Sequence, residues 1–253
     1  MKTVLSEKIE EPLLREGLQE LESELKEVSS GLDVKIEAAT TDGGWVSLKY
    51  EGEDSEVFTE VLARDYGLAP VQLRNLELGN TYRGFITDSG RVGYGLYVDI
   101  GVLSPTRRDG LYPLHRTTAQ LADGAAQPLR QITRRFCLYS GLPINVRIEE
   151  LEGAGRIGLA LTDRQESHFK DWEKYPFDRV VVIGSLPSKV RRSIRRVGLD
   201  KDVVKVERLS LTSNVLTCKL GTEAPGVISK LGPQLATAKL YPFIPSVRAK
   251  PQK

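Results

Sequence analysis

Residues 92–101 read VGYGLYVDIG, a stretch in which Tyr94 and Tyr97 stand on either side of Gly95. The turn residues Asp88-Ser89-Gly90 come shortly before it, which predicts a β-strand that begins after a turn. Glycine lets a strand bend sharply, so the two tyrosines are expected to emerge near each other. This stretch therefore predicts a strand that presents two neighbouring aromatic rings.

Four further short segments with the composition of strands surround this one. They are Gly79–Thr87, Gly110–Leu114, Ile144–Leu151 and Arg156–Leu161. A longer, partly helical connection separates the third strand from the fourth. Five short strands with such a connection are typical of the OB barrel, whose members bind oligonucleotides and oligosaccharides. The sequence therefore predicts a barrel within residues 76–165.

The order of residues along these strands resembles the S1 family of RNA-binding domains. The resemblance is carried by Gly79, Tyr82 and Gly84, by Tyr94-Gly95-Leu96-Tyr97-Val98-Asp99-Ile100-Gly101, by Gly110-Leu111, and by Arg156-Ile157-Gly158-Leu159. It covers about a third of the chain and implies RNA binding on the barrel surface. Glu152 matches an acidic residue that the family often carries four positions before the arginine, whereas Pro113 stands where many members have a histidine.

Two exposed tyrosines on a barrel face form a platform on which unpaired bases stack. Such stacking contributes about 1–3 kcal/mol per base and depends little on sequence. Arg156 on the fifth strand is expected to hold a phosphate or to stack beside the rings. The alternative is that one tyrosine is a core residue and the other an ordinary edge residue. RNA contacts are therefore predicted at Tyr94, Tyr97 and Arg156.

Patterns of mixed helix and strand flank the barrel on both sides. Residues 1–75 predict the order strand, helix, two strands, helix. Residues 177–244 predict the order βαββαβ of a ferredoxin-like fold, with a packed connector at residues 167–176 before it. The predicted class is a multidomain α+β protein, in which a central five-stranded OB or S1-type barrel is flanked by α+β, ferredoxin-like domains.

Charge is divided unevenly along the chain, although the formal net charge is only +2. Residues 1–75 carry 8 Lys and Arg against 17 Asp and Glu, and residues 165–253 carry 17 against 8. The sharpest feature is a predicted helix at Ser188–Val197, with Val190, Ile194 and Val197 on one face. Its cations, called the helix cations below, are Lys189, Arg191, Arg192, Arg195 and Arg196.

Like charges at helical spacing repel one another by a few tenths of a kcal/mol per pair. Bound phosphates would relieve this repulsion and supply much of the affinity for RNA. The alternative is charge pairing, within the chain or between copies, with the acidic first domain. The predicted helix of that domain carries Glu16, Glu20, Glu24 and Glu27. The helix cations are therefore predicted as a second set of RNA contacts, which grips the RNA together with the barrel.

The sequence offers no signature of an enzyme. Gly93-x-Gly95 precedes a strand and lacks the helix and lysine of a phosphate-binding loop. Cys137, Cys218 and the two histidines show no metal-ligand spacing. No run is apolar enough to cross a membrane, and no secretion signal is visible. We therefore expect a cytoplasmic protein that is not an enzyme, uses no cofactor or metal and does not enter a membrane.

As a whole the chain resembles an uncharacterised archaeal family, a domain of unknown function with an S1-like middle, which implies a cytoplasmic archaeal protein. The prediction is a non-enzymatic RNA-binding protein that acts on ribosomal or messenger RNA, with the ribosome as a candidate partner, in translation or RNA processing. The alternative is a protein-interaction scaffold without RNA binding. Such a scaffold would assemble through its acidic and basic domains, as a homo-oligomer or with an acidic protein partner.

Overall fold

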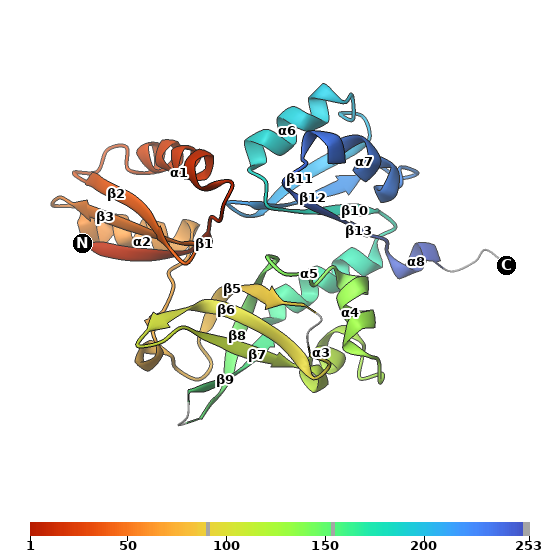
Figure 1. The fold of residues 1–253 in the computed structure, drawn as a ribbon, viewed down its shortest axis with the longest axis horizontal. Coiled ribbons are helices and arrows are strands. Elements are labelled where there is room, and N and C mark those ends of the chain that lie inside the picture. Colours follow the sequence, from red (N-terminus) through yellow and green to blue (C-terminus); the bar gives the residue numbers. More distant parts are fainter. Residues whose placement is uncertain (90–91, 153–154, 250–253) are drawn as a thin grey trace.

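The computed structural model describes residues 1–89, 92–152 and 155–249. Its strands form three separate sheets. The N-terminal unit contains a sheet of three strands, the central unit a sheet of six and the C-terminal unit a sheet of four. The six-stranded sheet closes on itself into a five-stranded barrel (Figure 1). This architecture confirms the predicted mixed α+β class with a central barrel.

The N-terminal unit is a three-stranded antiparallel sheet of order β1-β3-β2 with two helices packed on it. Its elements are β1 (Lys2–Lys8), α1 (Leu14–Val28), β2 (Lys35–Asp42), β3 (Trp45–Glu51) and α2 (Ser55–Asp65). Apolar residues at helical spacing place Leu21 and Leu25 of α1 in one core with Leu48 and Phe58. Burial of these helix faces against the sheet holds the unit together.

The barrel closes because β6 pairs with both β5 and β7. Around it the strands follow the order β5-β6-β7-β9-β8, and of these pairs only β7–β9 is parallel. Its elements are β4 (Val71–Gln72), η1 (Leu73–Asn75), β5 (Thr81–Asp88), β6 (Gly95–Ser104), β7 (Arg108–Pro113), α3 (Leu114–Leu121), α4 (Leu129–Phe136), β8 (Pro143–Glu152) and β9 (Arg156–Leu161). At Gly95 a Cβ atom would stand 2.7 Å from the carbonyl oxygen of Tyr112, so glycine alone lets β6 approach β7 this closely.

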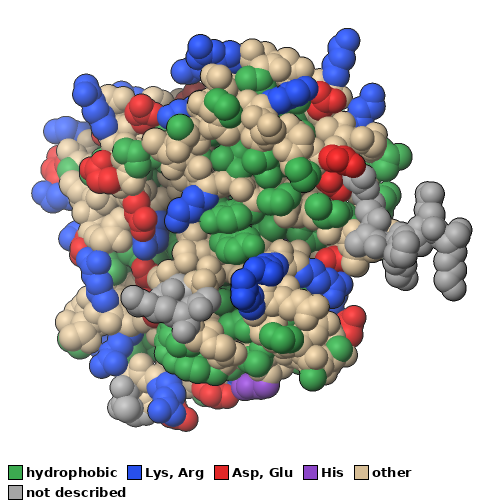
Figure 2. Space-filling view, turned by 45° about the vertical axis from the view of Figure 1, so that its right-hand side comes forward, with side chains coloured by type: hydrophobic (Ala, Val, Ile, Leu, Met, Phe, Trp, Pro, Cys, Tyr) green, Lys and Arg blue, Asp and Glu red, His purple; other side chains and the backbone are tan. Residues whose placement is uncertain are grey.

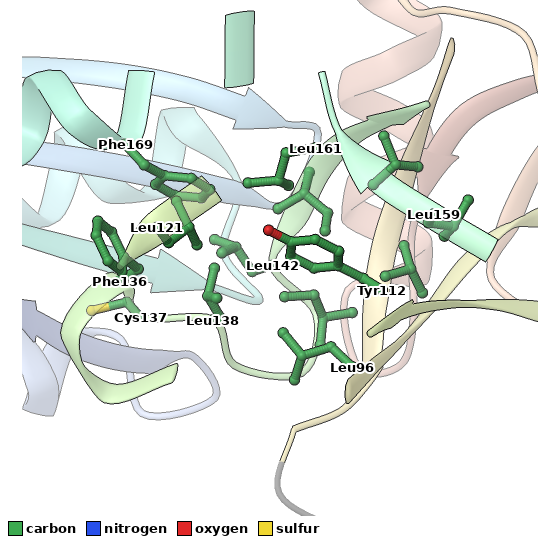
Figure 3. Packing of buried hydrophobic residues seen from close by; sticks show 14 of the residues in the cluster. Leu96, Tyr112, Leu121, Phe136, Cys137, Leu138, Leu142, Leu159, Leu161 and Phe169 are labelled. Carbon is green, nitrogen blue, oxygen red and sulfur yellow. The ribbon is translucent and has the colours of Figure 1, made fainter. Parts of the chain in front are cut away.

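The barrel interior and the helices beside it share one apolar core. Figure 3 shows Leu96, Tyr112 and Leu159 turned toward one another inside the barrel. Phe136 of α4 and Phe169 continue this core outside the strands, with ring centroids 5.9 Å apart. The helices therefore extend the barrel core toward the C-terminal unit.

The C-terminal unit has the order β10-α6-β11-β12-α7-β13, with its strands arranged β11-β12-β10-β13 and all pairs antiparallel. Its elements are β10 (Arg179–Ile183), α6 (Pro187–Arg196), β11 (Val203–Ser210), β12 (Ser213–Cys218), α7 (Ala224–Leu231), η2 (Gly232–Gln234), β13 (Lys239–Phe243) and α8 (Ser246–Ala249). Val181 and Ile183 of β10 join the barrel core, whereas Val180 and Val182 face α6 and α7. This sheet therefore lies between the barrel and α6 (Figure 1).

Helix α5 (Asp163–Lys174) contains most of the connector predicted at residues 167–176. The Thr162 hydroxyl caps this helix by accepting a hydrogen bond from the backbone N–H of Gln165. Trp172 of α5 is buried and meets the ring of Phe243 on β13, with centroids 5.3 Å apart. Helix α5 thus packs the C-terminal sheet onto the barrel.

Glu7 lies where all three units meet. This β1 residue is only 2% exposed. Its carboxylate accepts hydrogen bonds from the Arg83 guanidinium of β5 at 2.5 Å and from the Leu211 backbone N–H, between β11 and β12, at 2.8 Å. Burial raises the pKa of Glu7, and the Arg83 charge opposes that shift. One carboxylate therefore ties the N-terminal unit to both of the others.

A second junction joins the N-terminal unit to the outer face of the barrel. The indole Nε1–H of Trp45 donates to the Asp99 carboxylate of β6 at 2.8 Å, and Lys8 Nζ lies 3.2 Å from the same oxygen. Trp45 also meets Phe85 of β5 edge to face, with centroids 5.6 Å apart. The N-terminal unit therefore covers part of the barrel surface.

Replacing Arg83 with alanine is expected to lower the free energy of unfolding by about 3–5 kcal/mol, because the buried Glu7 carboxylate loses its counter-charge. Urea unfolding at pH 7 measures this loss. The pKa of Glu7 in the folded variant then lies further above the ordinary 4.5. The deficit is therefore present at neutral pH and shrinks as the pH falls through the raised pKa of Glu7 toward 4.5, below which Glu7 is protonated in both the folded and the unfolded state.

The control for this experiment is Arg147→Ala, which breaks surface pairs with Glu149 and Asp163 and should change stability little. A deficit for Arg83→Ala no larger than that of the control would contradict the role assigned to Glu7.

Candidate nucleic-acid interface

Part of the outer face of the barrel is left open beside the N-terminal unit. An open groove of about 1060 Å³ runs over β6, β7 and the start of β9. We call it the tyrosine groove; its lining residues are Thr87, Val92, Tyr94, Tyr97, Arg107, Arg108, Asp109, Leu111, Gly155, Arg156 and Ile157. Strand register explains why several of them share a face, because Tyr97 pairs with Leu111 and Asp99 with Asp109.

Tyr94 and Tyr97 come together in this groove as the sequence predicts. Tyr94 is 53% exposed and Tyr97 is half-buried. Their rings meet edge to face with centroids 6.4 Å apart, and their hydroxyl oxygens are hydrogen-bonded at 2.8 Å. This hydrogen bond raises the pKa of Tyr97 above that of an ordinary tyrosine. Neither ring belongs to the core, so both are available for stacking.

Three arginines surround the tyrosine pair. Arg156 stands at the start of β9, is largely exposed and pairs with Glu152 at 3.2 Å. Arg107 precedes β7 and pairs with Asp42 at the end of β2, so this groove residue is held by the N-terminal unit. Arg108 has no carboxylate partner among the described residues. The groove thus combines aromatic rings with cations, the two features that bind single-stranded nucleic acid.

Sequence reasoning identified Arg156 but missed Arg107, Arg108, Thr87 and Asp109 as groove residues. One signal could have indicated the arginines. Arg107 and Arg108 are adjacent and lie shortly before Gly110-Leu111, and no lysine occurs between Lys49 and Lys170. No local pattern indicated Thr87 or Asp109, because strand pairing across the barrel brings them together.

The helix cations lie elsewhere. Val190 and Ile194 of α6 are buried against the C-terminal sheet, as their spacing predicts. Arg191, Arg192, Arg195 and Arg196 are exposed and Lys189 is half-buried. In Figure 2, Lys and Arg side chains project along the upper edge of the molecule, the level at which α6 lies. Because the C-terminal sheet separates α6 from the barrel, the helix cations and the tyrosine groove do not form one surface.

The acidic helix α1 meets the C-terminal unit but not through the helix cations. Glu24 pairs with Arg208 of β11 at 2.7 Å, and Glu20 accepts a hydrogen bond from the Ser188 hydroxyl at the start of α6. Over residues 1–89, 92–152 and 155–249, the five helix cations make no ion pair. Their charge is therefore open to a partner outside the described chain.

Two further sequence expectations concern metals and membranes. Within the described residues, no three His, Cys, Asp or Glu side chains gather in a way that could hold a metal ion. In the same part of the chain, every helix is too short or too polar to cross a bilayer.

Comparison with known proteins places the whole chain in one family. Its models match as the DUF2110 N-terminal domain over residues 2–71, the DUF2110 central domain over residues 76–173 and the DUF2110 C-terminal domain over residues 177–241. The sequence matches none of the curated proteins. A solved structure, uncharacterized protein MJ1198 from Methanocaldococcus jannaschii, is 18% identical, covers 35% of this chain and 95% of its own, and has a TM-score of 0.23, so this likeness carries no argument. On the three domain matches, the chain belongs to the DUF2110 family.

Proposed function

We propose that this chain is a non-enzymatic, cytoplasmic RNA-binding protein that stacks unpaired bases in the tyrosine groove. Its RNA would be ribosomal or messenger RNA, in translation or RNA processing. The observation that carries the proposal is the exposed Tyr94 beside the half-buried Tyr97, with three arginines around the pair. The rings supply sequence-tolerant stacking, and the arginines supply phosphate contacts.

The place of the groove on the barrel supports this proposal. In OB barrels, oligonucleotides bind on the face of the second and third strands and at the loops that follow the first and fourth strands. Here β6 and β7 are the second and third strands, and both line the groove. Val92 comes from the loop after the first strand, and Gly155 from the loop after the fourth. The S1-like order of residues falls on the same strands.

The helix cations form a second proposed RNA contact. They are unpaired within the described chain and stand on a surface separate from the groove. Charge of this kind binds the phosphate backbone without regard to sequence. The two surfaces therefore make different demands on an RNA, one for unpaired bases and one for phosphates.

Replacing both Tyr94 and Tyr97 with alanine is expected to weaken binding of a single-stranded RNA, by about 1–3 kcal/mol for each base that no longer stacks. The slope of log affinity against log salt should stay unchanged, because the cations that hold the phosphates remain in place. Fluorescence anisotropy over a salt series measures both quantities. Tyr175→Ala removes an exposed tyrosine outside the groove and serves as the control.

Replacing both Arg192 and Arg196 with alanine is expected to flatten that salt slope, by about 0.7 for each phosphate of a single strand that is no longer neutralised. Arg15→Ala with Lys26→Ala removes two exposed cations from α1 and should leave the slope as it is. If the tyrosine and arginine double variants both bind RNA like the parent, the assigned surfaces are wrong.

The scaffold alternative has a distinct outcome. Sedimentation at low and high salt would then show self-association that dissociates in salt, together with no affinity for RNA. That result would indicate that the acidic N-terminal unit and the basic C-terminal unit serve self-association, and it would overturn the proposal of RNA binding.

A further inference from the structure

Asp109 places a carboxylate inside the tyrosine groove. It lies on β7, opposite Asp99 of β6, whose own carboxylate is occupied by Trp45 and Lys8. The Thr87 hydroxyl donates to Oδ2 of Asp109 at 2.9 Å. Among the described residues nothing else pairs with this carboxylate, so Oδ1 is left without a protein partner. The side chain is exposed and faces the groove.

A free carboxylate is unfavourable in a groove that receives a polyanion, because it repels phosphate. The neighbouring arginines do not neutralise it, since Arg107 and Arg156 pair with Asp42 and Glu152 instead. A carboxylate accepts hydrogen bonds only, so the part of a nucleic acid that suits it is a base edge rich in N–H groups. Asp109 therefore suits the bases of a bound strand rather than its backbone.

Strand register places Asp109 within reach of a base stacked on Tyr97. Tyr97 pairs with Leu111, and Asp109 lies two residues along the same face of β7. Such diagonal neighbours on an antiparallel pair stand about 7–8 Å apart. A base lying on the Tyr97 ring can therefore direct its edge toward Oδ1. Partial desolvation raises the pKa of Asp109, although its side chain stays exposed to solvent.

We propose that Asp109 is a specificity residue that favours bases with an exocyclic amino group, which are adenine, cytosine and guanine, over uracil. The amino group donates to the carboxylate. The N3–H of uracil is flanked on both sides by carbonyl oxygens, which repel it. Thr87 is a positioning residue that fixes Oδ2 and leaves Oδ1 toward the base. This inference rests on the proposed function, since it concerns which RNA the tyrosine groove prefers.

The test compares oligocytidine and oligouridine of eight nucleotides, which are matched in size and ring type, by fluorescence anisotropy at one salt concentration. The parent is expected to bind oligocytidine about ten-fold more tightly, the discrimination typical of a hydrogen bond to a base edge. Asp109→Asn should bring this ratio close to one, mainly by raising the affinity for oligouridine. Thr87→Val should reduce the ratio by a smaller factor.

Asp163→Asn is the matched control, because it removes the same charge from an exposed carboxylate outside the groove. It should leave the preference intact. If the parent binds both oligonucleotides equally, or if Asp109→Asn keeps the parent's ratio, the selectivity is overturned while RNA binding stands. If the parent binds neither, the proposed function fails and this inference fails with it.

Discussion

The placement of the N-terminal unit against the other two units depends on one buried carboxylate. A glutamate removed from water costs several kcal/mol unless charge and hydrogen bonds compensate for it. Glu7 obtains these from Arg83 of the barrel and from the Leu211 N–H of the C-terminal unit. The Glu7 carboxylate is fully hydrogen-bonded only when Arg83 and Leu211 are both in place. Strand β1 therefore favours one placement against the barrel and the C-terminal unit.

The outer face of the barrel is divided between the protein's own N-terminal unit and the open groove. Asp99 belongs to the S1-like pattern of β6, yet its carboxylate holds Trp45 and Lys8. Asp109, its partner across the strand pair, lies on the open side. Of these two carboxylates on one face of the barrel, Asp99 is bound by the N-terminal unit and Asp109 lies open to the groove. The ion pair of Arg107 with Asp42 marks the boundary between the covered and the open part.

Local patterns were enough to predict the strands, the tyrosine pair and the buried face of α6. The bend at Gly95 and the spacing of Val190 and Ile194 each act over a few residues, which is the range that periodicity describes. The sequence did not predict that α6 and the groove lie on different sides. That separation depends on which face of the C-terminal sheet packs on the barrel, and both faces of β10 carry buried apolar residues.

The gathering of Thr87, Arg108 and Asp109 escaped prediction for a related reason. These residues meet only because β5, β6 and β7 pair side by side around a closed barrel. A shift of one residue in β7 would turn Asp109 to the interior. The sequence shows that the central unit contains arginines, but it does not show which of them lie beside Tyr94 and Tyr97.

The position of α6 behind the C-terminal sheet limits the path of any RNA that touches both surfaces. A short oligonucleotide can occupy the groove or the helix, but it cannot bridge them through the packed sheet. A longer molecule must bend around the edge of the protein, or two separate segments must bind at once. In either case, RNA binding as proposed would hold two stretches of RNA at a fixed distance from each other, on two separate surfaces of the protein.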